Sequence, residues 1–194
     1  MRCPVQSSNN TDKGQSHVHR WKKLSKNESA SWVFAKVKGS LKPCITQLRR
    51  ISAIKSVSPV TGRFDLVIRL RTNEPSQTLN AVEEIRRVKG VASTQTAISL
   101  RNVSSNERGS RSEQPLAYTL VKVRGALGSV LQKVRSFPNL VEAHIIPGEF
   151  DLVASFRGRD QDEVMETSVE RINNISGVSA SETLMSWSPS TSLE

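Results

Sequence analysis

The amino-acid sequence contains two copies of one unit, and this duplication constrains the fold more than any other feature. Residues 62–67 (Gly-Arg-Phe-Asp-Leu-Val) recur as residues 148–153 (Gly-Glu-Phe-Asp-Leu-Val), a spacing of 86 residues. Further along, Gly90 corresponds to Gly177, so the second copy contains one additional residue. The first spacing also relates two apolar series: Leu41, Cys44, Ile45, Leu48 and Ile51 correspond to Leu127, Val130, Leu131, Val134 and Phe137. A spacing kept over this length indicates two small folds in tandem, each of about eighty residues.

The repeat divides the chain into two domains and three polar segments. We predict a first domain at residues 29–101 and a second at residues 116–187, joined by a linker at residues 102–115. Residues 1–28 are predicted to form a disordered basic tail, because they are polar and have few apolar anchors, and residues 188–194 a short polar tail. A core of fewer than roughly 80 residues rarely contributes more than ~3–5 kcal/mol, so we expect the two domains to pack against each other.

The cysteine content and the lack of long apolar segments indicate a cytoplasmic protein. Cys3 lies in the polar tail and Cys44 on the apolar face of a predicted helix, which favours a reducing compartment over a disulfide scaffold. No apolar run approaches the ~20 residues that cross a bilayer, and the first residues lack the pattern of a secretory signal. His17 and His19 lie in the same tail as Cys3 without a fourth ligand, so we predict no metal site and no cofactor.

The net charge of +10 is distributed unevenly. Residues 1–28 carry +4, residues 29–102 carry +9, residues 103–114 are neutral and residues 115–194 carry −3. Two interpretations remain open. The basic part can attract the acidic part, within one chain or between chains, or it can attract the phosphates of a nucleic acid regardless of sequence. The basic residues that would follow a phosphate backbone are Lys22, Lys23, Lys26, Lys36, Lys38, Lys42, Arg49 and Arg50.

Each copy has the residue pattern of a strand, a helix, two strands, a helix and a last strand. In the first copy, an apolar series with helical spacing follows a Ser40 cap, and a second such series begins at Ser76. Strands are expected at residues 32–38, 54–60, 64–71 and 91–100. This order predicts an α+β fold of two tandem ferredoxin-like βαββαβ domains, each a four-stranded antiparallel sheet with two helices on one face.

The helix-free face of each predicted sheet bears aromatic and apolar side chains. Alternation along the third strand of each copy directs Phe64 and Phe150 toward the helices. The opposite face holds the residues that we predict to form an interface: Trp32, Phe34, Tyr118 and Leu120. A face of this kind is not left in water. We therefore expect the two sheets to pack face to face, or against the sheets of another chain.

With this order of elements, the chain resembles the effector-binding domain of the leucine-responsive and asparagine regulators, the Lrp/AsnC family. The resemblance covers about residues 30–100 and 116–187. Its matching stretches are the two Gly-x-Phe-Asp hairpins and the two Gly-Val approaches to the last strand, at residues 60–67, 146–153, 88–91 and 175–178. The resemblance implies a domain that dimerises sheet to sheet, assembles further and binds a small amino acid near the Gly-x-Phe-Asp turn at an interface. The ligand-binding residues that it implies are Gly62, Asp65, Gly148 and Asp151.

The sequence also departs from the pattern of that family. The regulators have a helix-turn-helix domain in front of the effector-binding domain, whereas residues 1–28 show no three-helix pattern. Pro147 stands in the second copy where the family has a polar residue before the glycine. The duplication further suggests that the two copies form within one chain the dimer that single-copy relatives form between chains.

The candidate residues also have structural interpretations. Asp65 and Asp151 could each form an ion pair with the lysine one strand over, Lys36 and Lys122 respectively, and such a pair can coexist with ligand binding. The hairpin glycines fit a turn that requires a positive φ. The sequence contains no nucleophile paired with a base, no phosphate-binding glycine loop and no paired-cysteine motif, so we predict that the protein is not an enzyme.

Three functions fit these observations. The first is a stand-alone sensor that binds an amino acid or similar small effector and modulates transcription through a partner regulator by co-assembly. The alternative is a nucleic-acid-associated protein that binds DNA or RNA nonspecifically through its basic tail and first domain. The third is an assembly domain whose pocket is vestigial. In each case we expect an internal pseudo-dimer, with a higher oligomer or co-assembly beyond it, and no contact with a membrane.

Overall fold

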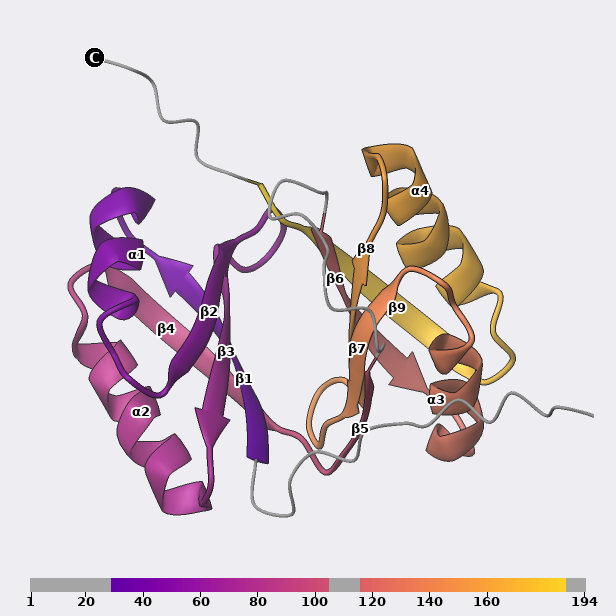
Figure 1. Ribbon diagram of the computed structural model, residues 1–194, viewed down its shortest axis with the longest axis horizontal. Helices are drawn as coiled ribbons and strands as arrows, with labels where there is room; N and C mark the ends of the chain where they lie inside the picture. Colours follow the sequence, from indigo (N-terminus) through magenta and orange to yellow (C-terminus); the bar gives the residue numbers. More distant parts are fainter. Residues whose placement is uncertain (1–28, 105–115, 188–194) are drawn as a thin grey trace, which may run out of the picture.

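The computed structural model describes residues 29–104 and 116–187. Two antiparallel sheets face one another, and helices cover their outer faces, α1 and α2 on one side and α3 and α4 on the other (Figure 1). The α+β fold of two tandem ferredoxin-like units is thereby confirmed. The predicted tails at residues 1–28 and 188–194, and residues 105–115 of the predicted linker, lie outside the described residues.

The first copy forms a four-stranded sheet in the order β2-β3-β1-β4. Its elements are β1 (Ser29–Val37), α1 (Leu41–Leu48), β2 (Ile54–Pro59), β3 (Leu66–Thr72), α2 (Pro75–Arg87) and β4 (Val91–Ile98). Cys44, Ile45 and Leu48 bury one face of α1, at the helical spacing visible in the sequence. Both helices pack on the same face of the sheet, which leaves the other face for the second copy.

The second copy repeats this arrangement and adds one strand at the edge. Its elements are β5 (Arg101–Ser104), β6 (Leu116–Val123), α3 (Leu127–Arg135), β7 (Leu140–Ile145), β8 (Leu152–Arg157), α4 (Gln161–Met165), a π-helical segment η1 (Glu166–Arg171) and β9 (Val178–Met185). The sheet order is β5-β7-β8-β6-β9. Without β5 this order matches that of the first sheet, so the repeat in the sequence is a repeat in the structure.

Three apolar cores hold the molecule together. One lies between the first sheet and its helices, one between the second sheet and its helices, and the third between the two sheets. The central strand β1 contributes to two of them, because Val33 and Ala35 face the helices whereas Trp32 and Phe34 face the second sheet. Successive side chains of a strand point to opposite faces, so a strand buried on both faces reads as a nearly continuous apolar run.

The start of the predicted linker is corrected by the structure. Residues 102–104 belong to β5, which pairs antiparallel with β7 at the edge of the second sheet. The second sheet therefore has one strand more than the four predicted. Val103 provides the physical reason, because it packs against the core between this sheet and its helices. A single apolar residue in a polar segment gave no strand signal in the sequence.

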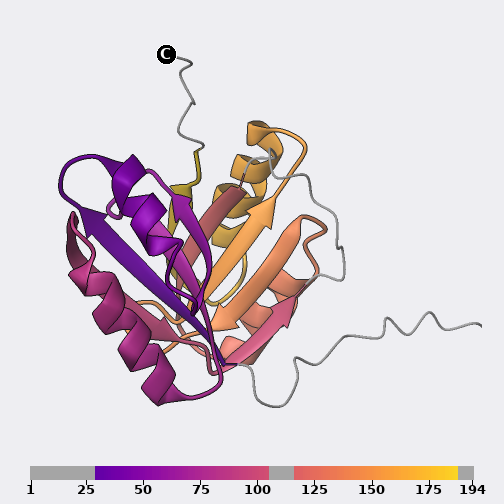
Figure 2. The same ribbon diagram turned by 60° about the vertical axis from the view of Figure 1, so that its left-hand side comes forward.

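The last strand of each copy continues onto the sheet of the other copy. After β4, the backbone N–H of Leu100 donates to the carbonyl of Ile145 at 2.9 Å. After β9, the backbone N–H of Trp187 donates to the carbonyl of Pro59 at 3.1 Å. These residues occupy corresponding positions of the repeat, so the exchange is reciprocal. Figure 2 shows the first sheet lying across the second, with the connection through β5 at its lower edge.

The additional residue of the second copy lies in its second helix. Where α2 is α-helical throughout, α4 continues into the π-helical segment η1. A π turn closes its hydrogen bonds from residue i to i+5 instead of i+4, so it absorbs one residue without rotating the rest of the helix. Ile172 beyond η1 is accordingly fully buried, like its counterpart Ile85 in α2.

Phe64 and Phe150 lie on the face opposite to the one that alternation predicts. The strands β3 and β8 begin at Leu66 and Leu152, so the alternation does not extend back through the hairpins. Phe64 is buried in the core between the sheets, with its ring centroid 5.2 Å from that of Phe34. Phe150 packs against the same core. The two hairpins thus belong to the space between the sheets.

A candidate ligand-binding site between the sheets

The two copies meet around a pseudo-twofold axis that relates residue i to residue i + 86. Arg63 Nη1 lies 2.7 Å from Glu149 Oε1, a pair separated by 86 positions. The rings of Trp32 and Tyr118, which correspond by the same spacing, meet edge to face with centroids 5.9 Å apart. In a symmetric dimer each such position would contact its own copy in the other subunit. The contact between the sheets is therefore the internal equivalent of a dimer interface, in which the two members of a pair can differ.

The four residues predicted for the interface lie together in the core between the sheets. Trp32, Phe34, Tyr118 and Leu120 are all at most 4% exposed. Tyr118 also forms a hydrogen bond of 2.7 Å with the Ser58 hydroxyl, and burial raises the pKa of Tyr118, so its phenol stays protonated. Burying one large apolar side chain stabilises a protein by about 1.5–3 kcal/mol. The interface is thus a substantial part of the stability of both copies.

Each Gly-x-Phe-Asp hairpin is held to the first strand of its own copy by its aspartate. Asp65 Oδ2 accepts the backbone N–H of Val37 at 2.8 Å, and Asp151 Oδ2 accepts that of Val123 at 2.9 Å. Both acceptors serve N–H groups at the points where the register of β1 and β6 shifts. A buried N–H left without a partner would destabilise the fold, so these contacts have a structural purpose.

Of the two aspartate–lysine ion pairs that the sequence suggested, the one in the second copy forms. Lys122 Nζ lies 3.3 Å from Asp151 Oδ1. Within the described ranges, no corresponding ion pair joins Lys36 to Asp65. The hairpin glycines, Gly62 and Gly148, have φ values of 122° and 143°, where side chains other than glycine are strained.

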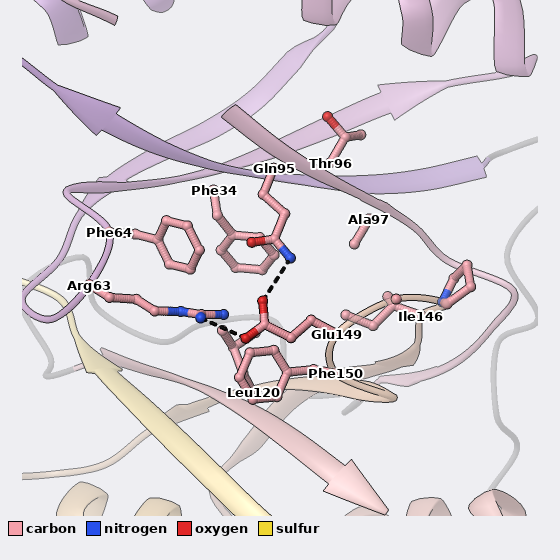
Figure 3. A pocket seen from close by; sticks show the side chains of 12 residues that line it. Phe34, Arg63, Phe64, Gln95, Thr96, Ala97, Leu120, Ile146, Glu149 and Phe150 are labelled. Atoms are coloured by element: carbon pink, nitrogen blue, oxygen red, sulfur yellow. Dashed lines mark hydrogen bonds and ion pairs between the residues drawn. The ribbon is translucent and has the colours of Figure 1, made fainter. Parts of the chain in front are cut away.

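A cavity of about 50 Å³ lies between the two hairpins (Figure 3). Its lining comes from both copies: Phe34, Arg63, Phe64, Gln95, Thr96 and Ala97 from the first, and Leu120, Ile146, Pro147, Gly148, Glu149 and Phe150 from the second. Of the four residues predicted to bind a ligand, Gly148 lines this cavity. The lining residues do not include Gly62, Asp65 or Asp151. Their role in ligand binding stays a prediction, and this cavity does not support it.

Charged groups of opposite sign stand at this cavity. The Arg63 guanidinium lies over the rings of Phe64 and Phe150, with its Cζ 4.8 Å and 4.9 Å from their centroids. A cation over an aromatic face is attracted by the ring quadrupole. The hydrogen bond to Glu149 raises the pKa of Arg63 and lowers the pKa of the Glu149 carboxyl, so both groups stay charged. Glu149 Oε2 also accepts a bond of 3.5 Å from Gln95.

The sequence reasoning did not single out Arg63 or Glu149. Both occupy the variable position of the Gly-x-Phe-Asp motif, where a motif comparison carries no information. A signal was nevertheless present, because the two copies hold side chains of opposite charge at corresponding positions. Once the copies are expected to pack about a twofold axis, such a difference predicts an ion pair across it.

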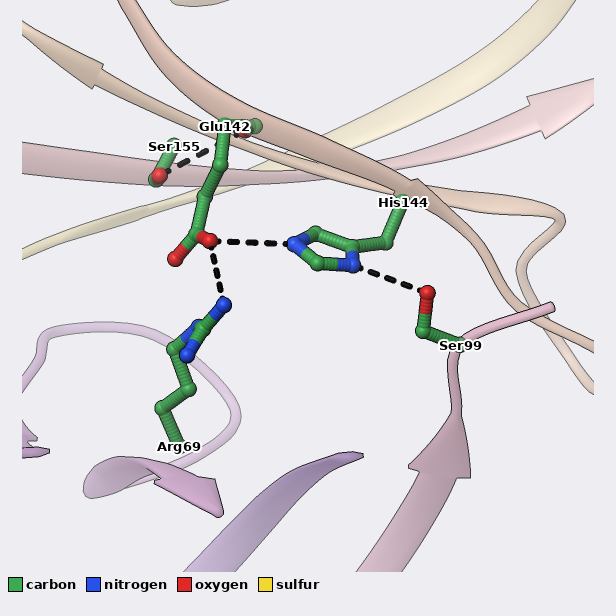
Figure 4. Close-up of polar contacts among 5 residues, drawn as sticks. All are labelled: Arg69, Ser99, Glu142, His144 and Ser155. Carbon is green, nitrogen blue, oxygen red and sulfur yellow. Dashed lines mark hydrogen bonds and ion pairs between the residues drawn. The ribbon is translucent and has the colours of Figure 1, made fainter. Parts of the chain in front are cut away.

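A second polar cluster lies between the sheets, away from the cavity (Figure 4). Arg69 Nη2 donates to Glu142 Oε2 at 2.6 Å, and the same carboxylate lies 3.1 Å from His144 Nε2. His144 Nδ1 lies 2.9 Å from the Ser99 hydroxyl. Burial would raise the pKa of Glu142, but the hydrogen bond with His144 and the charge of Arg69 together lower it below its usual value.

The order Ser99, His144, Glu142 has the form of a serine–histidine–acid relay, which sequence reasoning missed because its members come from both copies. An oxyanion requires free backbone donors next to the serine. Here the N–H groups of Ser99 and Leu100 donate to the carbonyls of Ala30 and Ile145. The Glu142 carboxylate is also shared with Arg69. The contacts of this cluster thus join the two sheets.

The described ranges offer no metal-binding or membrane-spanning features. No three or more His, Cys, Asp or Glu residues there are grouped so that they could hold a metal ion. No helix in these ranges is long and apolar enough to cross a bilayer. Cys44 is a free, buried thiol, and burial raises its pKa, which makes it a poor nucleophile.

The profile of the Lrp/AsnC ligand binding domain matches the chain twice, at residues 33–108 and 116–190. The chain belongs to the Lrp/AsnC family. It holds two copies of the ligand-binding domain of that family, which is the arrangement that the Gly-x-Phe-Asp repeat predicted.

Other similarities are more limited. Over 57 residues the chain is 32% identical to homocitrate synthase of Sulfurisphaera tokodaii, a match that covers 29% of this chain and 12% of that enzyme. The siroheme decarboxylase NirDL has a TM-score of 0.60 at 13% identity, covering 82% of this chain and 71% of its own. A mutant chlorite dismutase from Candidatus Nitrospira defluvii has a TM-score of 0.57 at 11% identity, covering 86% and 93%. At such identities the two structures share the fold with this Lrp/AsnC chain, and the likeness carries no further conclusion.

Proposed function

We propose that this chain binds a small amino acid in the cavity between the sheets and modulates a transcription regulator with which it assembles. The observation that supports this most directly is the pairing of charges at the cavity, with Arg63 from the first copy and Glu149 from the second. A free amino acid at neutral pH carries a carboxylate and an ammonium group together. A site for it needs both signs of charge within a few ångströms, over an apolar floor for the side chain.

Arg63 keeps a donor for the carboxylate of such a ligand. Its Nη1 donates to Glu149, whereas its Nη2 is shielded from solvent and has no hydrogen-bond partner among the described residues. Guanidinium groups bind carboxylates strongly through their N–H donors. In the proposed complex the Arg63 side chain turns so that Nη2 contacts the carboxylate of the ligand, and the ammonium group of the ligand contacts Glu149.

The volume favours the smallest amino acids. An engineered apolar cavity of about 150 Å³ binds benzene, and the cavity here is about 50 Å³. Glycine and L-alanine are therefore the first ligands to test. This cavity is also too small for a tetrapyrrole of the kind named for the siroheme decarboxylase, since pockets for large ligands occupy about 300–1,000 Å³.

A thermal-shift screen of the full chain against the standard amino acids, at millimolar concentration, tests the proposal. A ligand that binds only the folded state stabilises it by about 2.7 kcal/mol at a hundred times its Kd, so glycine or L-alanine should raise the Tm. Arg63→Gln should abolish the shift, because it removes the donor for the carboxylate. Arg171→Gln is a matched control, since Arg171 forms an ion pair of the same 2.7 Å length with Glu166 on the exposed helix surface.

Two outcomes would contradict ligand binding. One is a wild-type chain whose Tm does not change with any standard amino acid. The other is an Arg63→Gln variant that responds like the wild type. The regulatory step is tested separately, by size-exclusion chromatography of the chain mixed with a helix-turn-helix regulator of the same family. Co-elution that changes with L-alanine supports it, and separate elution under both conditions argues against it.

The uneven charge supports a second candidate, nonspecific binding of nucleic acid by the basic part of the chain. Residues 29–102 carry +9 against −3 for residues 115–194. Phosphate contacts make affinity fall steeply with salt. An electrophoretic shift of duplex DNA that weakens steeply as salt is added, and is lost on deleting residues 1–28, would favour this candidate over effector binding.

A further inference from the structure

A duplicated domain offers two related places for a cavity, one beside each hairpin glycine. The positions that decide the volume differ between the copies. Ala97 in β4 corresponds to Leu184 in β9, and Gly148 corresponds to Gly62. The observed cavity is lined by Ala97 and Gly148. The related place is bounded by Leu184 and Gly62.

The place beside Gly62 is filled by a side chain. A Cβ atom built on Gly62 would lie only 2.8 Å from Leu184 Cδ2. Leu184 is fully buried and belongs to the core between the sheets. Its isobutyl group thus packs directly on the backbone of the hairpin and occupies the volume that a ligand would need.

The place beside Gly148 is open. A Cβ atom built on Gly148 would have no atom within 4 Å. Ala97 stands where the other copy has leucine, and it lacks the Cγ and Cδ carbons that would reach across to the hairpin. Because interiors are otherwise packed as densely as crystals of small molecules, a missing isobutyl group leaves a cavity.

The polar contact beside the cavity is also weaker than the corresponding contact beside the filled place. Gln95 corresponds to Glu182. Beside the filled place, Arg63 Nε lies 3.0 Å from Glu182 Oε2. Beside the cavity, Glu149 accepts a longer bond of 3.5 Å from the neutral amide of Gln95. Both contacts cross between the copies. Glu149 has only a neutral amide where Arg63 has a second ion pair, so its Oε2 is held less tightly and is available to a ligand.

We propose that each chain has a single effector site, between Ala97 and Gly148, and that Leu184 closes its pseudo-symmetric counterpart. The identity of the ligand in this proposal rests on the proposed function. The asymmetry of the two places does not depend on that function. A symmetric dimer of single-copy domains presents every site twice. The tandem chain instead binds one effector, so two sites of one interface cannot act cooperatively.

Two substitutions in the full chain test the proposal. Crystal structures of the wild type, Ala97→Leu and Leu184→Ala would show the cavities, and calorimetric titration with L-alanine would give the number of sites. The wild type should have one cavity and one site per chain. Ala97→Leu should fill the cavity and weaken binding by roughly tenfold or more. Leu184→Ala should open a second cavity beside Gly62 and give a second site. Ala97→Val serves instead if the leucine variant does not fold.

The results distinguish this inference from the proposed function. Two equal sites in the wild type, an open cavity in the Ala97 variants, or a Leu184 side chain turned away from Gly62 would each overturn the single-site inference. Cavities as expected in all variants, with no heat of binding from L-alanine or glycine, would uphold the asymmetry and instead count against effector binding.

Discussion

At the scale of single residues, corresponding positions in the two copies have different neighbours. Gly62 and Gly148 both adopt a positive φ, yet one touches Leu184 and the other faces open space. Arg63 and Glu149 occupy one motif position with opposite charge. Duplication allows such differences, because each position of the interface can change without changing its partner. A homodimer has no such freedom.

The hairpin glycines give a matched pair of substitutions. Gly148→Ala is expected to lower the free energy of unfolding by about 1–3 kcal/mol, the usual effect of a side chain in a sparsely populated backbone region. Gly62→Ala should lower it by about 1–3 kcal/mol more, because the new methyl group overpacks against Leu184. Urea denaturation of both variants measures the difference. Equal losses would show that Leu184 does not press on the hairpin.

Glu142 provides a prediction on pH. Its folded-state pKa is lowered, so its ionised form stabilises the fold fully above the ordinary carboxyl pKa of about 4.3. This contribution is lost as the pH falls through the lower folded-state value. Glu142→Gln removes the titration and leaves Arg69 without its carboxylate, which should lower stability at pH 7 by about 3 kcal/mol, as for other buried ion pairs.

The measurement is urea denaturation of the wild type and Glu142→Gln between neutral and acidic pH. The two stability curves should converge as the carboxyl becomes protonated in the wild type. Glu83→Gln is the control, since its ion pair with Arg87 is exposed on both sides and should contribute little. A constant gap between the wild type and Glu142→Gln down to the lowest pH would contradict the assignment.

At the scale of elements, the π-helical segment η1 is the clearest difference between the copies. A π turn leaves a backbone carbonyl without its usual helical partner. In η1 the carbonyl of Ser168 accepts hydrogen bonds from the hydroxyls of Thr119 (3.3 Å) and Thr183 (2.9 Å). The first copy has Val33 at the position of Thr119. The inserted residue therefore frees a backbone carbonyl, and the buried threonine hydroxyl donates a hydrogen bond to it.

Deleting one exposed residue tests this account of η1. Deletion of Glu170 should convert the π turn into an α turn and preserve the fold, with a loss of about 1–3 kcal/mol because Thr119 loses its acceptor. Deletion of the corresponding Glu84 in α2 should prevent folding, because it rotates the rest of a regular helix by about 100° and takes Ile85 out of the core. Circular dichroism and thermal melting compare the two. Equal damage from both deletions would contradict an absorbed insertion.

Much of the architecture was predictable from the sequence, because it depends on local patterns. The spacing of apolar residues and the repeat predict the buried helix faces, the strand order and the aromatic sheet face that contains Trp32. Phe64 was placed on the wrong face, because the hairpin interrupts the strand alternation there. Val103 was not recognised as part of a strand, because it is a single apolar residue in a polar segment. The cavity was not predictable either. Its volume depends on Ala97 and the facing hairpin, which meet only across the interface.

At the scale of the whole molecule, the core between the sheets makes the two copies one cooperative unit. Trp32 contacts residues of both copies, with its ring 5.9 Å from that of Tyr118 and 5.3 Å from that of His144. The Arg69 guanidinium lies 5.5 Å from the same ring. The reciprocal strand extensions add backbone bonds between the sheets. Neither copy can unfold without exposing the face of the other.

Hydrogen exchange in the full chain tests this coupling. Trp32→Ala should lower the free energy of unfolding by about 3–5 kcal/mol, as expected for a buried tryptophan. Because the core is shared, amide protection should fall equally in peptides from residues 29–104 and from residues 116–187. Leu79→Ala, on an exposed position of α2, should change neither set. If Trp32→Ala instead reduced protection in the first copy alone, the second copy would be an independent domain. A ligand bound between the sheets could then not change the stability of both copies.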